Sequence, residues 1–193
     1  MKKFQALFLM SLLAPGASLL RAQDAVYDID PVHSTVLASV VHFGASTNWV
    51  RFNGPTGTVT VNEADPSKST IALEIKAESL DTANEKRDQH LKSPDFLNAK
   101  EFPVISFKST AVKKTGDKTF EVTGNLTAHG VTKPVTATFN AIGTGKGAKG
   151  ETRAGADATL TIKRADFGIG PTFPAAAISE DIVLHVSLEA IKK

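Results

Sequence analysis

The chain has 193 residues, of which 41% are hydrophobic and 22% are charged, with 14 glycines, 9 prolines and no cysteine. This balance predicts an ordered globular fold, because a disordered chain would have fewer apolar residues and a larger charge imbalance. The lack of cysteine excludes thiolate catalysis, disulfide exchange and cysteine-based metal sites.

The first 22 residues have the pattern of a secretory signal peptide. Lys2 and Lys3 precede an apolar run from Phe4 to Leu13, and small residues follow before a cleavage position after Ala22. The apolar run is well short of the ~20 residues that a membrane-spanning helix needs, which disfavours an N-terminal anchor. We therefore expect a mature chain of residues 23–193 that forms one domain and lies in the periplasm or is secreted.

Removal of residues 1–22 takes away three basic residues and no acidic ones, which leaves 19 basic residues against 20 acidic ones and a net charge of −1. Such a chain offers no strongly basic surface. We therefore expect no nucleic-acid partner.

From residue 35 onward, apolar and polar residues alternate with a period of two, which predicts strands with one buried face. Turn-forming residues separate the strands, which indicates hairpins and an antiparallel sheet. About eight such strands in one domain predict an all-β fold, either a closed barrel or a sandwich. In chain order the patterned segments are 35–43, 56–62, 71–75, 104–112, 120–124, 135–141, 153–163 and 182–190.

The last of these segments has the most regular alternation. Ile182, Leu184, Val186 and Leu188 are expected to face the interior. Val183 and His185 would then face outward, where they could contribute to a homodimer contact.

One short helical insertion, at about residues 82–97, interrupts the strand pattern. Thr82 followed by Glu85 predicts a capping box, with a helix that continues to Lys92. Ser93 and Pro94 then favour a second short turn that ends near Leu97.

On this predicted helix, Ala83, Arg87, His90 and Leu91 share one face at spacings of three and four residues. If any face of the helix turns toward the barrel, it is this one. Arg87 and His90 are therefore the candidates for polar groups in a pocket, with hydrogen bonds to strand carboxylates or carbonyls as the alternative. Asp88 and Lys92 are expected to pair along another face.

Common enzyme signatures are missing: the chain has no G-x-S-x-G, S-x-x-K or H-E-x-x-H motif. The five histidines show no short ligand spacing, so no metal site is predicted. Carboxylates near strand ends are expected to stabilise turns. Catalytic use of Asp or His on barrel loops, in a periplasmic hydrolase or isomerase, remains an alternative. These carboxylates are Asp28, Asp30, Asp166, Glu180 and Asp181.

Phenylalanine dominates the aromatic residues, with eleven copies against one Trp and one Tyr. Such residues can fill a solid core or line the lumen of a small barrel that holds a ligand, and periodicity alone does not distinguish these cases. The candidate ligand-binding residues on the strands and loops are Phe43, Phe52, Phe96, Phe107, Ala137, Phe139, Phe167 and Leu184.

The order of motifs along residues 27–169 resembles the YceI-like family of exported polyisoprenoid-binding proteins. The motifs with the highest specificity are YDIDPVHS at 27–34, RDQHLKSPDF at 87–96 and LTAHGVTKPV at 126–135. Two positions depart from the family pattern, at Val50 and at Gly155-Ala156, and both bear on the expected pocket wall.

This resemblance implies a lipocalin-like, eight-stranded antiparallel barrel around an elongated apolar pocket. It implies binding or carriage of a long-chain isoprenoid lipid, of the quinone or prenyl pyrophosphate type, with no catalysis and no cofactor beyond the bound lipid. The partner in exchange would be a membrane or a membrane protein. A stress-protective interaction protein with a filled core is the second alternative.

Overall fold

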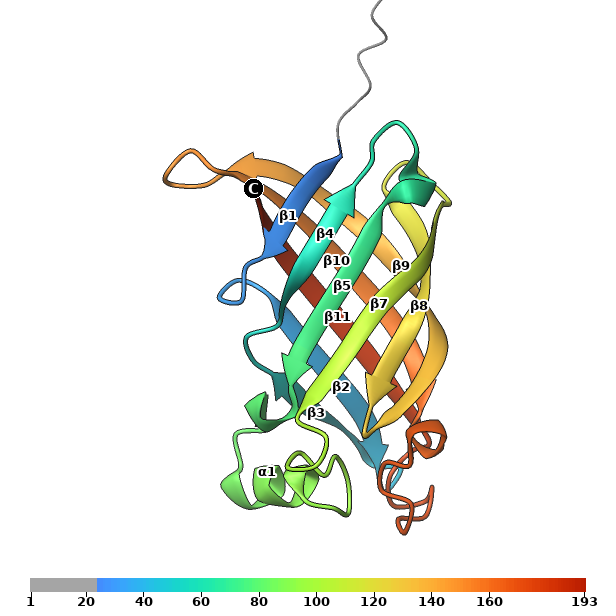
Figure 1. The fold of residues 1–193 in the computed structure, drawn as a ribbon. Coiled ribbons are helices and arrows are strands. Elements are labelled where there is room, and N and C mark those ends of the chain that lie inside the picture. Colours follow the sequence, from blue (N-terminus) through green and yellow to red (C-terminus); the bar gives the residue numbers. More distant parts are fainter. Residues whose placement is uncertain (1–23) are drawn as a thin grey trace, which may run out of the picture.

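The computed structural model describes residues 24–193, and the predicted signal peptide lies outside this range. Figure 1 shows strands that wrap around a central axis, with one short helix at the lower end. The strands are β1 (Ala25–Ile29), β2 (Thr35–His42), β3 (Ser46–Phe52), β4 (Thr56–Val61), β5 (Thr70–Lys76), β6 (Leu80–Asp81), β7 (Val104–Lys114), β8 (Thr119–Ala128), β9 (Val131–Lys146), β10 (Thr152–Lys163) and β11 (Asp181–Lys192). The helices are α1 (Glu85–Lys92) and the 3₁₀ turns η1 (Pro66–Lys68), η2 (Ala77–Ser79) and η3 (Arg164–Phe167).

The sheet closes on itself as a barrel. Strands pair in the order β1-β4-β5-β7-β8-β9-β10-β11, and β11 pairs again with β1, so eight antiparallel strands form a ring. This closure confirms the predicted barrel and rules out the sandwich. The strands β1, β3 and β6 lie outside the eight segments that alternation predicted.

On the side away from β10, β11 pairs with two different strands along its length. It pairs with β1 through Ala190–Lys192 and with β2 through residues 183–187. β2 continues to β3, and β3 to the two-residue strand β6, so these three strands extend the wall at the lower end in Figure 1.

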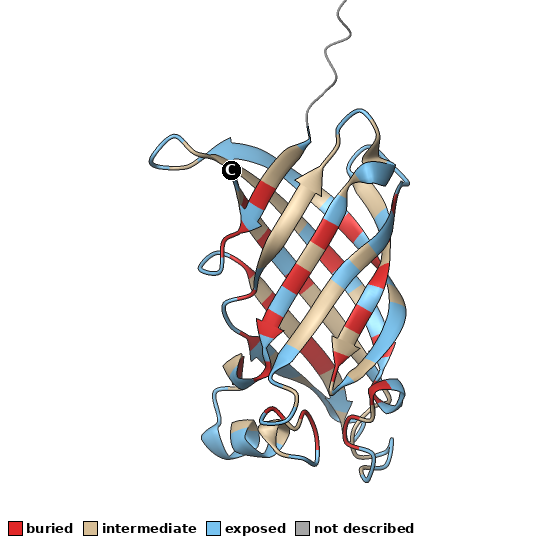
Figure 2. Ribbon diagram, viewed as in Figure 1, coloured by how far each residue is buried: buried red, intermediate tan, exposed pale blue. Residues whose placement is uncertain are grey.

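The interior is apolar because strand residues alternate between the two faces of the wall, as the red and blue bands in Figure 2 show. On β5, Ile71, Leu73 and Ile75 are buried, whereas Glu74 and Lys76 are exposed. On β9, Ala137 and Phe139 are buried between exposed threonine and asparagine side chains. The same pattern therefore runs around the ring and directs the apolar side chains inward.

The helical insertion begins two residues later than predicted, so the predicted capping box is wrong. The N-cap of α1 is Asn84, whose side-chain oxygen accepts a hydrogen bond from the Arg87 N–H at 3.0 Å. Ala83 has a φ of +58°, and this left-handed residue separates Thr82 from the helix. Thr82 instead donates from its backbone N–H to Asp88 at 2.8 Å.

The predicted pair of Asp88 and Lys92 is also wrong. Asp88 Oδ1 accepts from both the backbone and the hydroxyl of Thr82, which holds it at the start of the helix. The Lys92 ammonium lies 4.0 Å from Glu78. The predicted second turn is present, since Phe96 N–H donates to the Ser93 carbonyl at 3.0 Å.

Two segments cover the lower end of the barrel, residues 82–102 and residues 164–180 (Figure 1). They meet where the rings of Phe96 and Phe173 stack, with their centroids 4.7 Å apart. Arg164 is buried and organises the second segment by donating to the carbonyls of Gly170, Phe173 and Ser179 and to the Glu180 carboxylate. Within residues 24–193, no helix is long and apolar enough to span a membrane.

Candidate functional site: the barrel lumen

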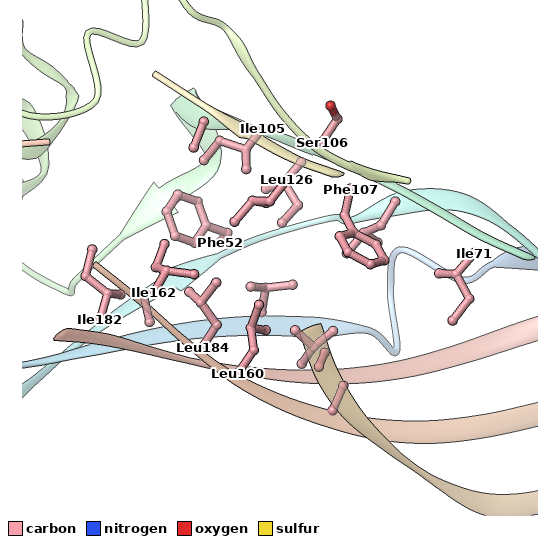
Figure 3. Close-up of a pocket in the computed structure, with 18 of the residues that line it drawn as sticks. Phe52, Ile71, Ile105, Ser106, Phe107, Leu126, Leu160, Ile162, Ile182 and Leu184 are labelled. Atoms are coloured by element: carbon pink, nitrogen blue, oxygen red, sulfur yellow. The ribbon is translucent and has the colours of Figure 1, made fainter. Parts of the chain in front are cut away.

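The lower part of the barrel encloses a cavity of about 120 Å³, here called the lower chamber. Its wall is apolar except at Ser106, and Figure 3 shows the Ser106 hydroxyl pointing away from the cavity. Leu97 and Ile169, from the two covering segments, close its lower end. The wall also includes Phe52, Ile71, Ile105, Phe107, Leu126, Leu160, Ile162, Ile182 and Leu184.

A second cavity of about 390 Å³, the upper chamber, lies toward the opposite end of the barrel. Its deep wall is apolar, whereas its rim includes Glu63, Lys114 and Thr144. The two chambers share Ile71, Phe139 and Leu188 in their walls, so they are neighbours along the barrel axis. The lumen therefore changes from apolar at the lower end to polar at the upper rim. These cavities argue against a solid, filled core.

Five of the candidate ligand-binding residues lie on the lumen wall. Phe52, Phe107, Ala137 and Leu184 line the lower chamber, and Phe139 lines both chambers. Their contact with a ligand stays a prediction, whereas their inward direction follows from the strand alternation. The inward face expected for β11 is also present, because Ile182, Leu184, Val186 and Leu188 all line the lower chamber.

Three of the phenylalanine candidates do not line either chamber. Phe43 is 67% exposed in the turn after β2, where its φ of +49° directs the chain back into β3. Phe96 is buried in the covering segment against Phe173. Phe167 is buried in η3, outside the wall of both chambers. The expectation that these three face the lumen is wrong, because each belongs to a turn or loop whose direction no alternation sets.

Arg87 and His90 do not face the lumen either. The Arg87 guanidinium folds back to donate to the Thr82 hydroxyl and carbonyl, both at 2.8 Å. His90 is about half exposed, with Nε2 3.2 Å from the Asp95 carboxylate and its ring 5.0 Å from that of Phe96. α1 has no fully buried residue, and of its predicted stripe only Leu91 packs against the core. Arg87 therefore forms hydrogen bonds within the protein, but to Thr82, which lies just after β6, and not to the strand carboxylate or carbonyl expected as the alternative.

Sequence reasoning did not select Tyr27, Glu63 and Lys114, which line the upper chamber. Tyr27 was detectable, since it alternates with buried Ile29 around exposed Asp28. Glu63 lies beyond the end of β4, and Lys114 is the last residue of β7. No sequence pattern predicted that these two charged residues would lie at the rim of the upper chamber.

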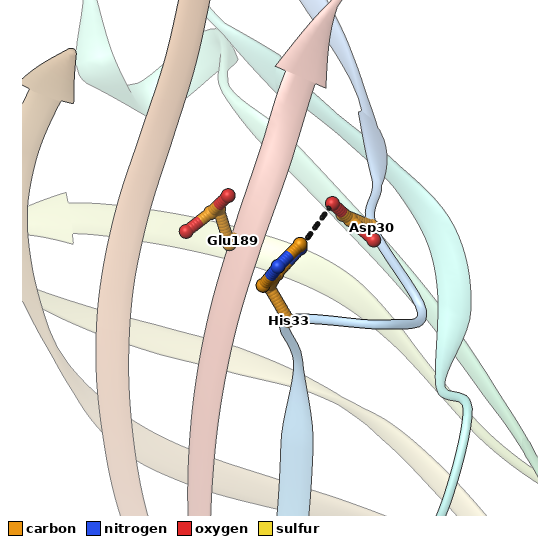
Figure 4. Close-up of side chains that lie close together, drawn as sticks. All are labelled: Asp30, His33 and Glu189. Carbon is orange, nitrogen blue, oxygen red and sulfur yellow. Dashed lines mark hydrogen bonds and ion pairs between the residues drawn. The ribbon is translucent and has the colours of Figure 1, made fainter. Parts of the chain in front are cut away.

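Outside the lumen, Asp30, His33 and Glu189 come together where β1 turns into β2 (Figure 4). His33 Nδ1 lies 2.8 Å from Asp30 Oδ2, and Arg153 Nη1 lies 2.9 Å from the same oxygen. Arg153 also pairs with Glu189, and with Glu151 at 2.8 Å. The hydrogen bond from His33, with those from the Val32 N–H and Arg153, lowers the pKa of Asp30 to about 2.

The ligand atoms of Asp30, His33 and Glu189 lie within 4.8 Å of one another, which is close enough for a metal site. The Arg153 guanidinium, however, already binds both carboxylates, and its charge would repel a second cation there. Hydrogen bonding to these carboxylates in turn raises the pKa of Arg153. None of the four residues lines either chamber. This arrangement fits a brace that holds β1 and β2 against β10 and β11.

Comparison with known proteins identifies the family. The model of the YceI-like domain matches residues 27–190. The UPF0312 protein of Pseudomonas putida strain GB-1 is 44% identical over 189 residues, which cover 94% of this chain and 95% of that protein. The chain belongs to the YceI-like family.

Two solved structures share the fold of this YceI-like chain. BcnA of Burkholderia cenocepacia is 22% identical, with a TM-score of 0.76 over 83% of this chain and 98% of that one. A polyisoprenoid-binding domain of Saccharophagus degradans, implicated in plant cell wall breakdown, is 17% identical, with a TM-score of 0.66 over 86% of this chain and 98% of that one.

The two departures from the YceI-like pattern have different surroundings. Val50 on β3 packs against the core and lines neither chamber. Gly155 and Ala156 line the upper chamber opposite a β-bulge at Ile142 of β9. A Cβ at Gly155 would meet Leu188 O at 3.6 Å, an ordinary contact, so the backbone does not require glycine here. Gly155 pairs with the outward Glu189 on β11, so a side chain at this position would point away from the lumen.

Proposed function

We propose that this YceI-like protein binds a long-chain isoprenoid lipid in its lumen and carries or stores it outside the cytoplasm without catalysing a reaction on it. The observation that carries the proposal is a closed lumen with an apolar lower chamber and a polar upper rim. This gradient matches an amphiphile with one long apolar chain and one polar end. The similarity in fold to a polyisoprenoid-binding domain supports the same ligand class.

The hydrophobic effect would supply most of the affinity. Each CH₂ group removed from water contributes roughly 0.8 kcal/mol, and association costs about 4–15 kcal/mol. Several buried isoprene units can therefore give micromolar or tighter binding. The polar end is of the quinone or prenyl pyrophosphate type.

The predicted signal peptide supports a periplasmic or secreted location. In an aqueous compartment a long isoprenoid chain needs cover from water, so the partner that supplies or accepts it would be a membrane or a membrane protein. Val183 and His185 face outward as expected, and the ring of Trp49 lies 5.4 Å from that of His185. A homodimer contact on this face stays a prediction.

The direct test is to identify what the lumen holds. The protein, produced with its own leader in a Gram-negative host, is purified from the periplasm, and its organic-solvent extract is analysed by mass spectrometry. We expect an isoprenoid lipid near one equivalent per chain, and none from the same protein after refolding in lipid-free buffer. Recovery of only diacyl phospholipids, or failure of the refolded protein to bind any added isoprenoid, would contradict the proposal.

A further inference from the structure

The hydroxyl of Tyr27 is a polar group without a protein partner inside the lumen. Tyr27 faces inward on β1 and is only 7% exposed, and it forms part of the upper chamber wall. No other residue of 24–193 forms a hydrogen bond with this hydroxyl. In the same range, every side-chain oxygen that is fully shielded from solvent does have a hydrogen-bond partner. The hydroxyl must therefore border open space, and the chamber provides that space.

The rest of the upper chamber restricts what this hydroxyl can meet. The cross-strand neighbour of Tyr27 on β4 is Val59, and most of the chamber wall is apolar. At the rim stand Glu63 and Lys114, neither of which forms an ion pair or a side-chain hydrogen bond with any residue of 24–193. One negative and one positive charge leave the rim close to neutral, which gives a multiply charged anion little net attraction.

A buried hydroxyl without a partner costs free energy that a ligand oxygen can recover. The lower chamber has no polar group directed into it, so the polar end of an amphiphile would lose its hydrogen bonds there. The shared wall at Ile71, Phe139 and Leu188 gives the chain a continuous apolar route between the chambers. These facts fix the direction of the ligand, with its tail below and its polar end above.

We propose that Tyr27 donates a hydrogen bond to an uncharged oxygen at the polar end of the ligand and so seats that end in the upper chamber. The inference rests on the proposed function, because it concerns the same lumen. It adds the residue that recognises the polar end, the orientation of the chain, and a preference for a neutral oxygen over a diphosphate.

The test compares Tyr27→Phe with the unsubstituted protein against three probes that have the same branched chain length. Geranylgeraniol has a neutral oxygen, geranylgeranyl diphosphate has an anionic end, and phytane has no polar end. We expect the variant to bind geranylgeraniol about three- to tenfold more weakly, which is the worth of one net hydrogen bond, and phytane as before. We also expect the unsubstituted protein to prefer geranylgeraniol to the diphosphate.

Thr138→Val is the matched control, because it removes a hydroxyl from the exposed outer face of β9, away from both chambers, and should leave all three affinities unchanged. The thermal midpoint of Tyr27→Phe should stay near that of the unsubstituted protein, since the lost hydroxyl has no protein partner. Tyr27 is the only tyrosine in the chain, so its absorption band reports this contact directly. The band should shift with geranylgeraniol and not with phytane in a Trp49→Phe background.

Equal affinity of both proteins for geranylgeraniol, or an equal loss for phytane, would overturn the role of Tyr27 while leaving lipid binding intact. A preference for the diphosphate that disappears in Lys114→Met would overturn the preference for a neutral oxygen. Failure of the unsubstituted protein to bind any of the three probes would instead contradict the proposed function itself.

Discussion

Ala137→Phe tests whether the lower chamber holds the ligand. Ala137 lies on β9, is 3% exposed and lines this chamber beside Phe139. A larger side chain at this position must extend into the cavity, because the strand on either side of it is fixed by pairing with β8 and β10. In a solid core such a substitution overpacks and costs about 1–3 kcal/mol.

The cavity volume sets the expected magnitudes. At about 120 Å³, the lower chamber is close to the size of an apolar cavity of ~150 Å³ that accepts a benzene molecule. A phenyl ring from position 137 would therefore occupy most of it. If one isoprene unit is displaced, its five carbons forfeit up to about 4 kcal/mol of burial, so we expect at least a tenfold loss of affinity, about 1.4 kcal/mol. The free energy of unfolding of the empty protein should change by less than that amount.

Both quantities are measured on delipidated protein, affinity by isothermal titration with geranylgeraniol and stability by urea unfolding. Thr138→Phe is the matched control, since the next residue on the same strand is exposed and its side chain faces outward. A large loss of stability together with unchanged binding would show that the ligand does not use the lower chamber. Unchanged binding together with unchanged stability would show that the side chain at position 137 does not point into the lower chamber.

Three further predictions concern other parts of the chain. Asn84→Ala should lower the free energy of unfolding by about 0.5–2 kcal/mol and speed hydrogen exchange in α1, and equal exchange rates in both proteins would refute the cap. Asp30 has a lowered pKa, so its stabilising contribution is complete above the unfolded-state pKa of about 4 and is lost as pH falls through about 2. Asp30→Asn should therefore be less stable at neutral pH, and acid unfolding curves should show the difference shrinking below about pH 4; a constant difference would argue against the ionised brace. Sequencing of the exported protein should find Gln23 at its N-terminus, and retention of residues 4–13 would contradict the signal peptide.

The barrel was predictable because the alternation of apolar and polar residues can be read from each strand separately, and closing the sheet into a barrel leaves this alternation unchanged. On β5 and β11 the inward set matches the period-two pattern, since one face of each strand must be apolar when the sheet curves around a core. β3 was harder to predict, because its burial alternates over residues 48–52 but its polarity does not follow: Asn48 is half-buried, whereas Trp49 is exposed. β6 has two residues, too few for any period to appear.

The helical insertion shows where local rules failed. Thr82 and Glu85 have the spacing of a capping box, and nothing nearby in the sequence excludes it. The left-handed conformation of Ala83 moves the N-cap of α1 to Asn84 and leaves Ala83 outside the helix, while Arg87 and His90 lie on an exposed part of it. Glu63 and Lys114 line the same chamber only because distant strands end at the same rim, which no short pattern encodes.

An open lumen in place of a solid core depends on the size of the inward residues more than on their polarity. Small barrels normally fill their interior with side chains. Here the inward residues that line the lower chamber include four alanines, whose methyl groups are too small to fill it: Ala38, Ala128, Ala137 and Ala158. Alternation identifies these positions as inward, and alanine at four of them leaves space that apolar walls keep dry. Phe52, Phe107 and Phe139 form part of the cavity wall, whereas the alanines leave the space that makes the cavity. Enlarging Ala137 should therefore fill that space at little cost to the empty fold.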